Sequence, residues 1–171
     1  MNIVLLGYMA SGKSTIGREI SKKLDMKFID LDNYISEQEK SSISDIFKVK
    51  GEIYFRKIES TYLTEILNSK ERFILSLGGG TPCYGNNMEL IQNSEVKSVY
   101  IQASIKTLVA RLILEKSKRP LVAALENNQI TEFVAKHLFE RRFFYEQASI
   151  TVNTDNKSIA EIIAEARVAL Y

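Results

Sequence analysis

The chain has 171 residues, of which 45% are hydrophobic and 26% are charged, an ordinary composition for a globular protein. Its 23 basic and 21 acidic side chains give a formal net charge of +2, which argues against a nucleic-acid-binding surface or a membrane-binding face. We therefore expect a single domain over residues 1–171, with neither a nucleic acid nor a membrane as a partner.

The chain contains one cysteine, Cys83, and one histidine, His137. A lone cysteine forms no internal disulfide, and the two residues are too few for a zinc site of cysteine and histidine ligands. The first apolar run begins at Asn2, without the charged segment that leads into a secretory signal. These features predict a protein of the reducing cytoplasm.

Strand-like and helix-like segments alternate along the chain, which predicts an α/β fold, a parallel sheet with helices on both faces. Short apolar runs predict five strands, at 2–6, 27–30, 73–77, 96–101 and 150–152. Apolar residues at helical spacing predict helices at 13–24, 42–49, 52–67, 86–92, 103–114, 129–145 and 159–170. Gly51 is the expected break between two of these helices, and the basic segment 115–124, which carries Pro120, is expected to be a loop.

The stretch GYMASGKST, residues 7–15, lies between the first predicted strand and the first predicted helix. It fits the pattern G-x-x-x-x-G-K-[ST] of a phosphate-binding loop, whose backbone N–H groups cradle phosphate oxygens. Lys13 could then reach the β- and γ-phosphates, and Ser14 could offer its hydroxyl to Mg²⁺. The alternative is a chance Gly-Ser turn, but both flanking segments favour a nucleotide phosphate site.

Two carboxylates, Asp30 and Asp32, stand at the end of the second predicted strand. Side chains two residues apart leave a strand on the same side, so both could face the phosphate loop. One could hold a Mg²⁺-bound water, and the other could accept a proton from an acceptor hydroxyl. An equally good interpretation is that the acids only end the strand and cap the following helix.

Three consecutive glycines, residues 78–80, follow the third predicted strand. A tight turn needs only one or two, so the third suggests that a ligand approaches the backbone closely. Arg56 and Glu59 share one face of a predicted helix, and by themselves they are most simply a surface ion pair.

Basic residues in two later segments could contact substrates. Arg119, in the predicted loop, could close over ATP or could be an ordinary solvated charge. Arg141 and Arg142 lie near the end of a predicted helix, where the helix dipole favours cations in any case. Two arginines from distant segments could instead clamp a carboxylate on the acceptor, because a guanidinium group binds carboxylates in a bidentate manner.

Taken together, these motifs resemble those of shikimate kinase, in the same order and over nearly the whole chain. The matching stretches are GYMASGKST, FIDLD, SISDIF, GEIYFRKIE with its F-R-x-x-E pattern, SLGGG, RPL and RRFFYEQA. The last of these resembles R-x-x-x-Y-E-x-A, which selects Arg141 rather than Arg142 by its distance from Tyr145.

The resemblance implies a P-loop kinase fold like that of the nucleoside monophosphate kinases, a five-stranded parallel sheet with a mobile lid at about 115–124 and substrate-binding helices at about 33–67. It implies ATP-dependent phosphorylation of the 3-hydroxyl of shikimate to shikimate 3-phosphate, a step of chorismate and aromatic amino acid biosynthesis. It further implies that the protein is a monomer and that Mg²⁺ accompanies ATP.

The same resemblance implies a role for each matching residue. Transfer would depend on Lys13, Asp32 and Arg119. Shikimate would be held by Asp32, Arg56, Glu59, Gly78, Gly79, Gly80 and Arg141. ATP would be bound by Gly7, Ala10, Ser11, Gly12, Lys13, Ser14, Thr15, Arg111, Arg119 and Lys157. Mg²⁺ would be held by Ser14 and, through water, by Asp30.

The chain departs from the family pattern in three places, none within the substrate motifs. Thr81-Pro82-Cys83 stands where small apolar residues are more usual, the segment 142–144 lacks a proline, and Lys157 stands where an arginine is frequent. The nearest alternatives are a nucleoside monophosphate kinase and a gluconate-type kinase, neither of which accounts for the full set of motifs. A regulatory GTPase-like switch would carry a guanine-reading N-K-x-D stretch, which is absent.

Overall fold

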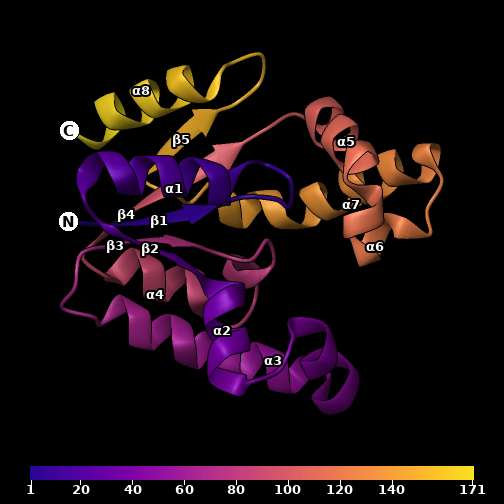
Figure 1. The fold of residues 1–171 in the computed structure, drawn as a ribbon, viewed down its shortest axis with the longest axis horizontal. Helices are drawn as coiled ribbons and strands as arrows, with labels where there is room; N and C mark the ends of the chain where they lie inside the picture. The colour runs from indigo at the N-terminus through magenta and orange to yellow at the C-terminus, as the bar shows by residue number, and fades with distance from the viewer.

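Five parallel strands form one sheet in the order β2-β3-β1-β4-β5 in this computed structural model, which describes residues 1–171 (Figure 1). The strands are β1 (Asn2–Leu6), β2 (Lys27–Asp30), β3 (Phe73–Ser76), β4 (Val96–Gln102) and β5 (Ile150–Asn153). The prediction of a five-stranded parallel sheet is confirmed, and each strand lies within one residue of its expected bounds.

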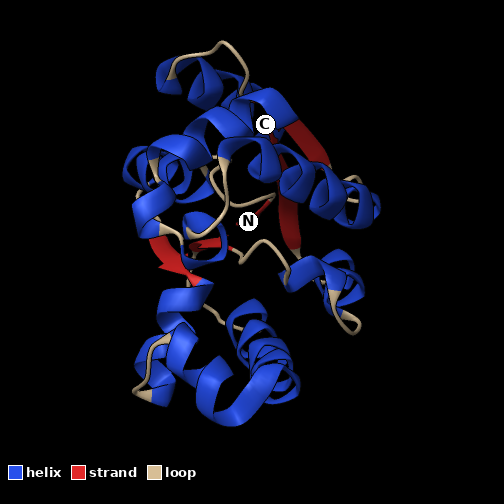
Figure 2. Cartoon of the chain, turned by 90° about the vertical axis from the view of Figure 1, so that its right-hand side faces the viewer, coloured by secondary structure: helices blue, strands red, loops and turns tan.

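Helices cover both faces of the sheet, as Figures 1 and 2 show. They are α1 (Lys13–Leu24), α2 (Leu31–Glu39), α3 (Ile43–Leu67), α4 (Asn87–Asn93), α5 (Ile105–Leu114), α6 (Pro120–Ala123), α7 (Asn127–Tyr145) and α8 (Ile159–Leu170). Two short 3₁₀ turns are η1 (Thr81–Cys83) and η2 (Lys116–Lys118). No helix is at once long and apolar enough to pass through a lipid bilayer.

The strand β1 lies at the centre of the sheet and separates two hydrophobic clusters. Ile3 and Leu5 pack with α1 and α8 on one face, and Val4 and Leu6 pack with α3, α4, α5 and α7 on the other. All four side chains are fully buried, because alternate residues of a strand point to opposite faces and helices cover both. This burial explains why NIVLL is apolar at every position after Asn2.

Three sequence-based expectations about elements need correction. The carboxylate argument assumed that Asp30 and Asp32 belong to one strand, but β2 ends at Asp30 and Asp32 lies in the first turn of α2. The helices expected at 33–67 therefore begin two residues earlier, at Leu31. The segment 115–124, expected to be a loop, contains η2 and α6, because Pro120 is compatible with the first turn of a helix.

The break at Gly51 is confirmed. Its φ of 85° and ψ of 171° interrupt α3, so the helix is two segments joined by a kink. An extended peptide unit with positive φ is a conformation that essentially only glycine adopts.

The connections after β1 and β3 define the position of the site. These strands are neighbours, with Leu5 opposite Ser76, yet the chain leaves β1 toward α1 on one face and leaves β3 toward α4 on the other. Adjacent connections that diverge in this way leave a crevice at the carboxyl ends of the strands. The phosphate loop and the three glycines open onto this crevice.

Candidate active site

The loop between β1 and α1 has the backbone of a phosphate nest. Gly7 and Gly12 have φ values of 148° and 96°, and Ala10 has a φ of 62°. A Cβ atom on Gly7 would lie 2.5 Å from the carbonyl oxygen of Ile101, so a side chain is excluded there. The N-terminus of α1 begins at Lys13 and adds the positive end of its dipole to the loop.

Lys13 is folded back onto this loop. Its Nζ donates hydrogen bonds to the carbonyl oxygens of Gly7 at 2.8 Å and Tyr8 at 2.9 Å, and the side chain is buried. Burial lowers the pKa of Lys13 to about 8, although the carboxylates of Asp32 and Asp30 act in the opposite direction. An anion bound in the loop would restore the preference for the charged form.

Ser14 and Asp30 place oxygen ligands beside the loop. The Ser14 hydroxyl donates to Asp30 Oδ2 at 3.0 Å, and Ser76 Oγ lies 3.5 Å from it. Asp30 Oδ1 accepts the backbone N–H of Asn33 at 3.2 Å, so the same carboxylate also caps α2. Both sequence interpretations of Asp30 therefore apply at once.

This pair fits Mg²⁺ as P-loop kinases hold it. Mg²⁺ takes oxygen ligands and keeps several waters, and one or two protein oxygens suffice when phosphates supply others. The chain has no group of three or more acidic, histidine or cysteine side chains that could hold a metal alone. The donor set thus suits a metal that arrives with the nucleotide.

Asp32 faces the same crevice and is poised to take up a proton. Burial raises the pKa of its carboxyl from 3.8 to about 6, and the carboxylates of Asp30 and Glu59 act in the same direction. Lys13 and Arg56 act in the opposite direction. A general base works best when its pKa lies near the working pH, and this environment moves Asp32 toward that range.

Each of the three glycines after β3 faces a different charged side chain. A Cβ atom on Gly78 would lie 3.2 Å from Asp32 Oδ1, and one on Gly79 would lie 3.2 Å from Arg141 Nη1. On Gly80 it would lie 2.9 Å from Arg56 Nη2. The missing side chains let three charged groups from three helices converge on one turn of backbone.

The interpretation of Arg56 and Glu59 as a surface ion pair is wrong, because Glu59 is 1% exposed. Arg56 Nη1 donates to Glu59 Oε1 at 2.9 Å, and the guanidinium carbon lies 3.8 Å from the centre of the Tyr84 ring. The second oxygen, Glu59 Oε2, accepts the hydroxyl of Thr81 at 2.8 Å. The arginine is therefore held by a buried carboxylate on one side and an aromatic ring on another.

The two arginines near the end of α7 have different surroundings. Arg141 is half-buried, faces Gly79 and lies over the Tyr8 ring at 5.7 Å. Arg142 is exposed and pairs with Glu146. The hydroxyl of Tyr145 donates to the carbonyl oxygen of Gly79, which ties α7 to the glycine turn.

A cavity of about 470 Å³ extends from the phosphate loop between α5 and α8. Arg111 and Arg119 line it: Arg111 Nη1 donates to the carbonyl oxygen of Ala10 at 3.0 Å, and Arg119 Nη2 pairs with Glu115 Oε2 at 2.9 Å. The wall does not include Gly7, and the other expected residues on it are Ala10, Ser11, Gly12, Lys13, Ser14, Thr15, Asp30, Asp32, Gly78, Gly79 and Lys157. Arg56, Glu59, Gly80 and Arg141 do not line this cavity but surround the glycine turn at its end.

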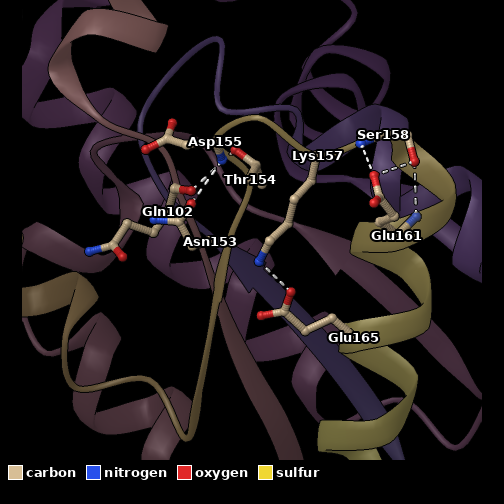
Figure 3. A network of polar contacts seen from close by, with 8 residues as sticks. All are labelled: Gln102, Asn153, Thr154, Asp155, Lys157, Ser158, Glu161 and Glu165. Atoms are coloured by element: carbon tan, nitrogen blue, oxygen red, sulfur yellow. Dashed lines mark hydrogen bonds and ion pairs between the residues drawn. The ribbon is translucent and has the colours of Figure 1, made fainter.

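The far wall of the cavity is the turn from β5 into α8, drawn in Figure 3. Ser158 and Glu161 form a capping box at the start of α8, and Thr154 is anchored to the carbonyl oxygen of Gln102 at 2.8 Å through its N–H. Lys157 extends along the helix to an ion pair with Glu165 (Figure 3). Lys157 is thus partnered within the protein while it borders the cavity.

Comparisons with known proteins agree with this arrangement. A sequence model of the family described as shikimate kinase matches residues 9–170. A shikimate kinase of Flavobacterium psychrophilum is 47% identical over 169 residues, which are 99% of this chain and 98% of the relative. The chain belongs to the shikimate kinase family. This assignment excludes the nucleoside monophosphate kinase, gluconate-type kinase and GTPase-like alternatives.

Solved shikimate kinases have the same fold. A crystal structure from Bacteroides thetaiotaomicron has a TM-score of 0.92 and 33% identity, over 99% of this chain and 98% of that chain. A shikimate kinase from Acinetobacter baumannii in complex with shikimate has a TM-score of 0.87 and 27% identity, over 99% and 92% of the two chains. The activity of the chain is the ATP-dependent phosphorylation of shikimate in aromatic amino acid biosynthesis, with ATP as co-substrate.

Sequence reasoning missed several contacts in this shikimate kinase site. Tyr84 stacks on Arg56, and Glu115 pairs with Arg119. No sequence motif marks Tyr84 or Glu115 as part of the site. No sequence pattern indicated the hydrogen bond between His137 Nδ1 and the Tyr8 hydroxyl, which are 2.8 Å apart. Thr81 was treated as outside the substrate motifs, yet it contacts Glu59 directly. Its only signal was the departure from small apolar residues after the glycines.

Proposed function

We propose that the crevice transfers the γ-phosphoryl group of ATP directly to the 3-hydroxyl of shikimate, with the roles implied by the sequence resemblance. The observation that carries this proposal is the convergence of Asp32, Arg141 and Arg56 on the three glycines. Two arginines and one carboxylate are the groups that an acceptor with a carboxylate and hydroxyls requires. The phosphate loop lies at the other end of the same crevice.

On the phosphate side, Lys13 and Arg119 neutralise charge on the moving phosphoryl group. Ser14 would hold Mg²⁺ directly and Asp30 through water, and the metal would supply positive charge against the negative charge that develops on the phosphates. Arg119 has to exchange its partner Glu115 for phosphate, which a movement of the segment 115–124 would allow. Arg111 and Lys157 border the rest of the nucleotide.

On the acceptor side, Arg56 and Arg141 bind the carboxylate of shikimate, and Glu59 holds Arg56 in place. Asp32 binds ring hydroxyls and accepts the proton from the attacking one. Asp32 also lies near Lys13 and Arg56, whose positive charges oppose the rise of its pKa, and with a pKa of about 6 most of the carboxyl is ionised at neutral pH.

All of these groups come from one chain, so we propose that the monomer is the active unit and that residues 1–171 form one domain. The lid at about 115–124 and the substrate-binding helices α2 and α3 are parts of this unit. The cytoplasmic location and the absence of nucleic-acid and membrane partners stay predictions.

The test is ADP release from Mg·ATP with no acceptor, with shikimate, and with gluconate or AMP as control acceptors. We expect strong stimulation by shikimate alone, because AMP has no carboxylate and gluconate carries its carboxylate and hydroxyls on an open chain instead of a ring. Turnover with another acceptor and none with shikimate would contradict the proposal.

Two variants locate the acceptor site in the same assay. Arg56→Ala should raise the KM for shikimate strongly while ATP still binds, because it removes one carboxylate ligand. Arg142→Ala is the matched control, since this exposed arginine pairs with Glu146 away from the glycine turn. Normal shikimate turnover in Arg56→Ala would refute the carboxylate contact.

A further inference from the structure

Thr81 is a fully buried residue directly after the three glycines, and its hydroxyl has a specific partner. Thr81 Oγ1 donates to Glu59 Oε2 at 2.8 Å, while Glu59 Oε1 accepts from Arg56 at 2.9 Å. The two oxygens of one buried carboxylate are thus used separately, one by the threonine and one by the arginine. The hydroxyl fixes the rotation of the carboxylate group that faces Arg56.

The hydroxyl is itself held in a rigid position. The backbone N–H of Thr81 donates to the carbonyl oxygen of Gly78 at 3.1 Å, and Asn87 Nδ2 donates to the carbonyl oxygen of Thr81 at 2.9 Å. Pro82, the next residue in η1, has a fixed φ. Because the Thr81 hydroxyl is anchored to the glycine turn, the position of this turn determines where the carboxylate of Glu59 lies.

Arg56 depends on these contacts for its orientation. Its Nε makes no hydrogen bond, and the nearest other carboxylate, Glu52 Oε1, lies 3.8 Å away on a side chain that is mostly exposed. The guanidinium is therefore oriented by Glu59 and by stacking on Tyr84. A displacement of the Glu59 carboxylate would therefore displace the Arg56 guanidinium as well.

The geometry points to Thr81 as a positioning residue for the acceptor: through Glu59, its hydroxyl holds the Arg56 guanidinium where the shikimate carboxylate binds. This inference rests on the proposed role of Arg56. It adds to the motif-derived site a residue that the F-R-x-x-E and G-G-G patterns do not contain. It also concerns shikimate and not ATP, because Thr81 lies on the glycine turn and does not line the cavity beside the phosphate loop.

The test compares Thr81→Val with Thr81→Ser. Valine keeps the volume and loses the hydroxyl donor, whereas serine keeps the donor and loses only a methyl group. We expect Thr81→Val to raise the KM for shikimate about tenfold, the effect of losing one hydrogen bond to a charged group. The KM for ATP should stay within about twofold, and Thr81→Ser should restore the KM for shikimate to within about twofold of the unmodified protein.

Three outcomes would overturn the inference. An unchanged KM for shikimate in Thr81→Val would show that the hydroxyl has no positioning role. Equal losses in the valine and serine variants would assign the effect to packing of the methyl group. An equal rise in the KM for ATP would indicate a general disturbance of the fold. If Thr81→Val is too unstable to purify, Thr81→Ala takes its place, because it also lacks the hydroxyl. Its KM for shikimate is then compared with that of Thr81→Ser in the same way.

A double-mutant cycle identifies the route of the effect. In a Glu59→Ala background the hydroxyl has lost its acceptor, so Thr81→Val should add almost nothing to the loss already present. Full additivity would mean that Thr81 does not act through Glu59. The variant Arg56→Ala separates the two proposals. If both Arg56→Ala and Thr81→Val leave the KM for shikimate unchanged, the proposed acceptor site is wrong. If Arg56→Ala raises the KM and Thr81→Val does not, only the positioning role of Thr81 is wrong.

Discussion

The raised pKa of Asp32 suits a general base but lowers the free energy of unfolding at neutral pH. Burial and the nearby carboxylates raise the pKa of this carboxyl from 3.8 to about 6. Because the pKa in the folded state lies above that in the unfolded state, the carboxyl favours folding below about pH 4, and this contribution is lost as the pH rises through 6. A difference of this size corresponds to about 3 kcal/mol above pH 6.

We therefore expect Asp32→Asn to make the protein more stable at neutral pH and much less active. The gain in the free energy of unfolding should be near zero at pH 4 and reach up to about 3 kcal/mol by pH 7, because asparagine stays uncharged. Shikimate phosphorylation should fall by about 10²- to 10⁴-fold, the usual value of a general base. Thermal unfolding between pH 4 and 8 and initial rates measure the two effects.

The exposed Asp25 at the end of α1 provides a control. Asp25→Asn should leave both the activity and the pH profile of stability unchanged, because asparagine tolerates the left-handed backbone at this position. In the unmodified protein, kcat/KM for shikimate should fall on the acidic side near pH 6 as Asp32 is protonated. A stability gain that is equal at pH 4 and pH 7 would contradict the ionisation argument.

At the scale of elements, the kinked helix α3 is fastened to α2 by a polar cluster. Glu39, at the end of α2, accepts the hydroxyls of Tyr54 at 2.8 Å and Tyr62 at 2.7 Å. Lys50, on the other side of the kink, lies 3.6 Å from Glu39 and over the Tyr54 ring. One carboxylate thus contacts both segments of α3 and stabilises their relative direction at Gly51.

We expect Gly51→Ala to destabilise the protein by about 1–3 kcal/mol in urea unfolding, the cost of a non-glycine residue in this backbone conformation. No other part of the protein lies within 4 Å of the position that the added Cβ would occupy, so crowding against the rest of the fold contributes nothing to the cost. Gly85→Ala is the matched control, since Gly85 is equally unobstructed and its φ of 53° lies in the left-handed region that other residues adopt at lower cost. Equal stability of Gly51→Ala and the unmodified protein would mean that α3 can straighten without loss.

At the scale of the whole molecule, the nucleotide cavity joins parts of the chain that are far apart in sequence. Its walls come from the loop after β1, the glycine turn after β3, α5, and the start of α8. A ligand that binds only this assembled arrangement stabilises the folded state as a whole.

We expect Mg·ATP at a hundred times its Kd to raise the Tm by roughly 5–10 °C, which follows from about 2.7 kcal/mol of linkage at this chain length. Lys13→Ala should lose most of this shift, because its ammonium group is the main cation in the loop. Lys22→Ala, which removes an exposed lysine paired with Glu19, should keep it. A shift retained in full by Lys13→Ala would place the phosphates elsewhere.

The features predictable from the sequence are those encoded over short distances. The phosphate loop is one continuous motif, and the five strands follow from runs of apolar residues that helices cover on both faces. The break in α3 follows from one glycine. Local chemistry decides each of these features, so a single sequence suffices.

The features that the sequence did not predict depend on contacts across the fold. Glu59 is a buried carboxylate, and one of its partners, Thr81, lies 22 residues later in the chain. The sequence left open whether Asp30 caps the following helix, and the fold decides it: Asp30 accepts the N–H of Asn33, and Asp32 lies in that helix. The Tyr8–His137 hydrogen bond joins residues 129 positions apart. No local pattern encodes such pairs.

The glycine turn after β3 has a genetic consequence. Every amino acid change at the codons for Gly78, Gly79 and Gly80 adds at least a Cβ atom, and each such atom would lie 2.9 to 3.2 Å from a charged side chain of the site. A change at the turn therefore displaces a charged side chain of the site in the same step. Adaptive change meets less resistance at the surrounding helices, where a shorter or uncharged side chain first makes room.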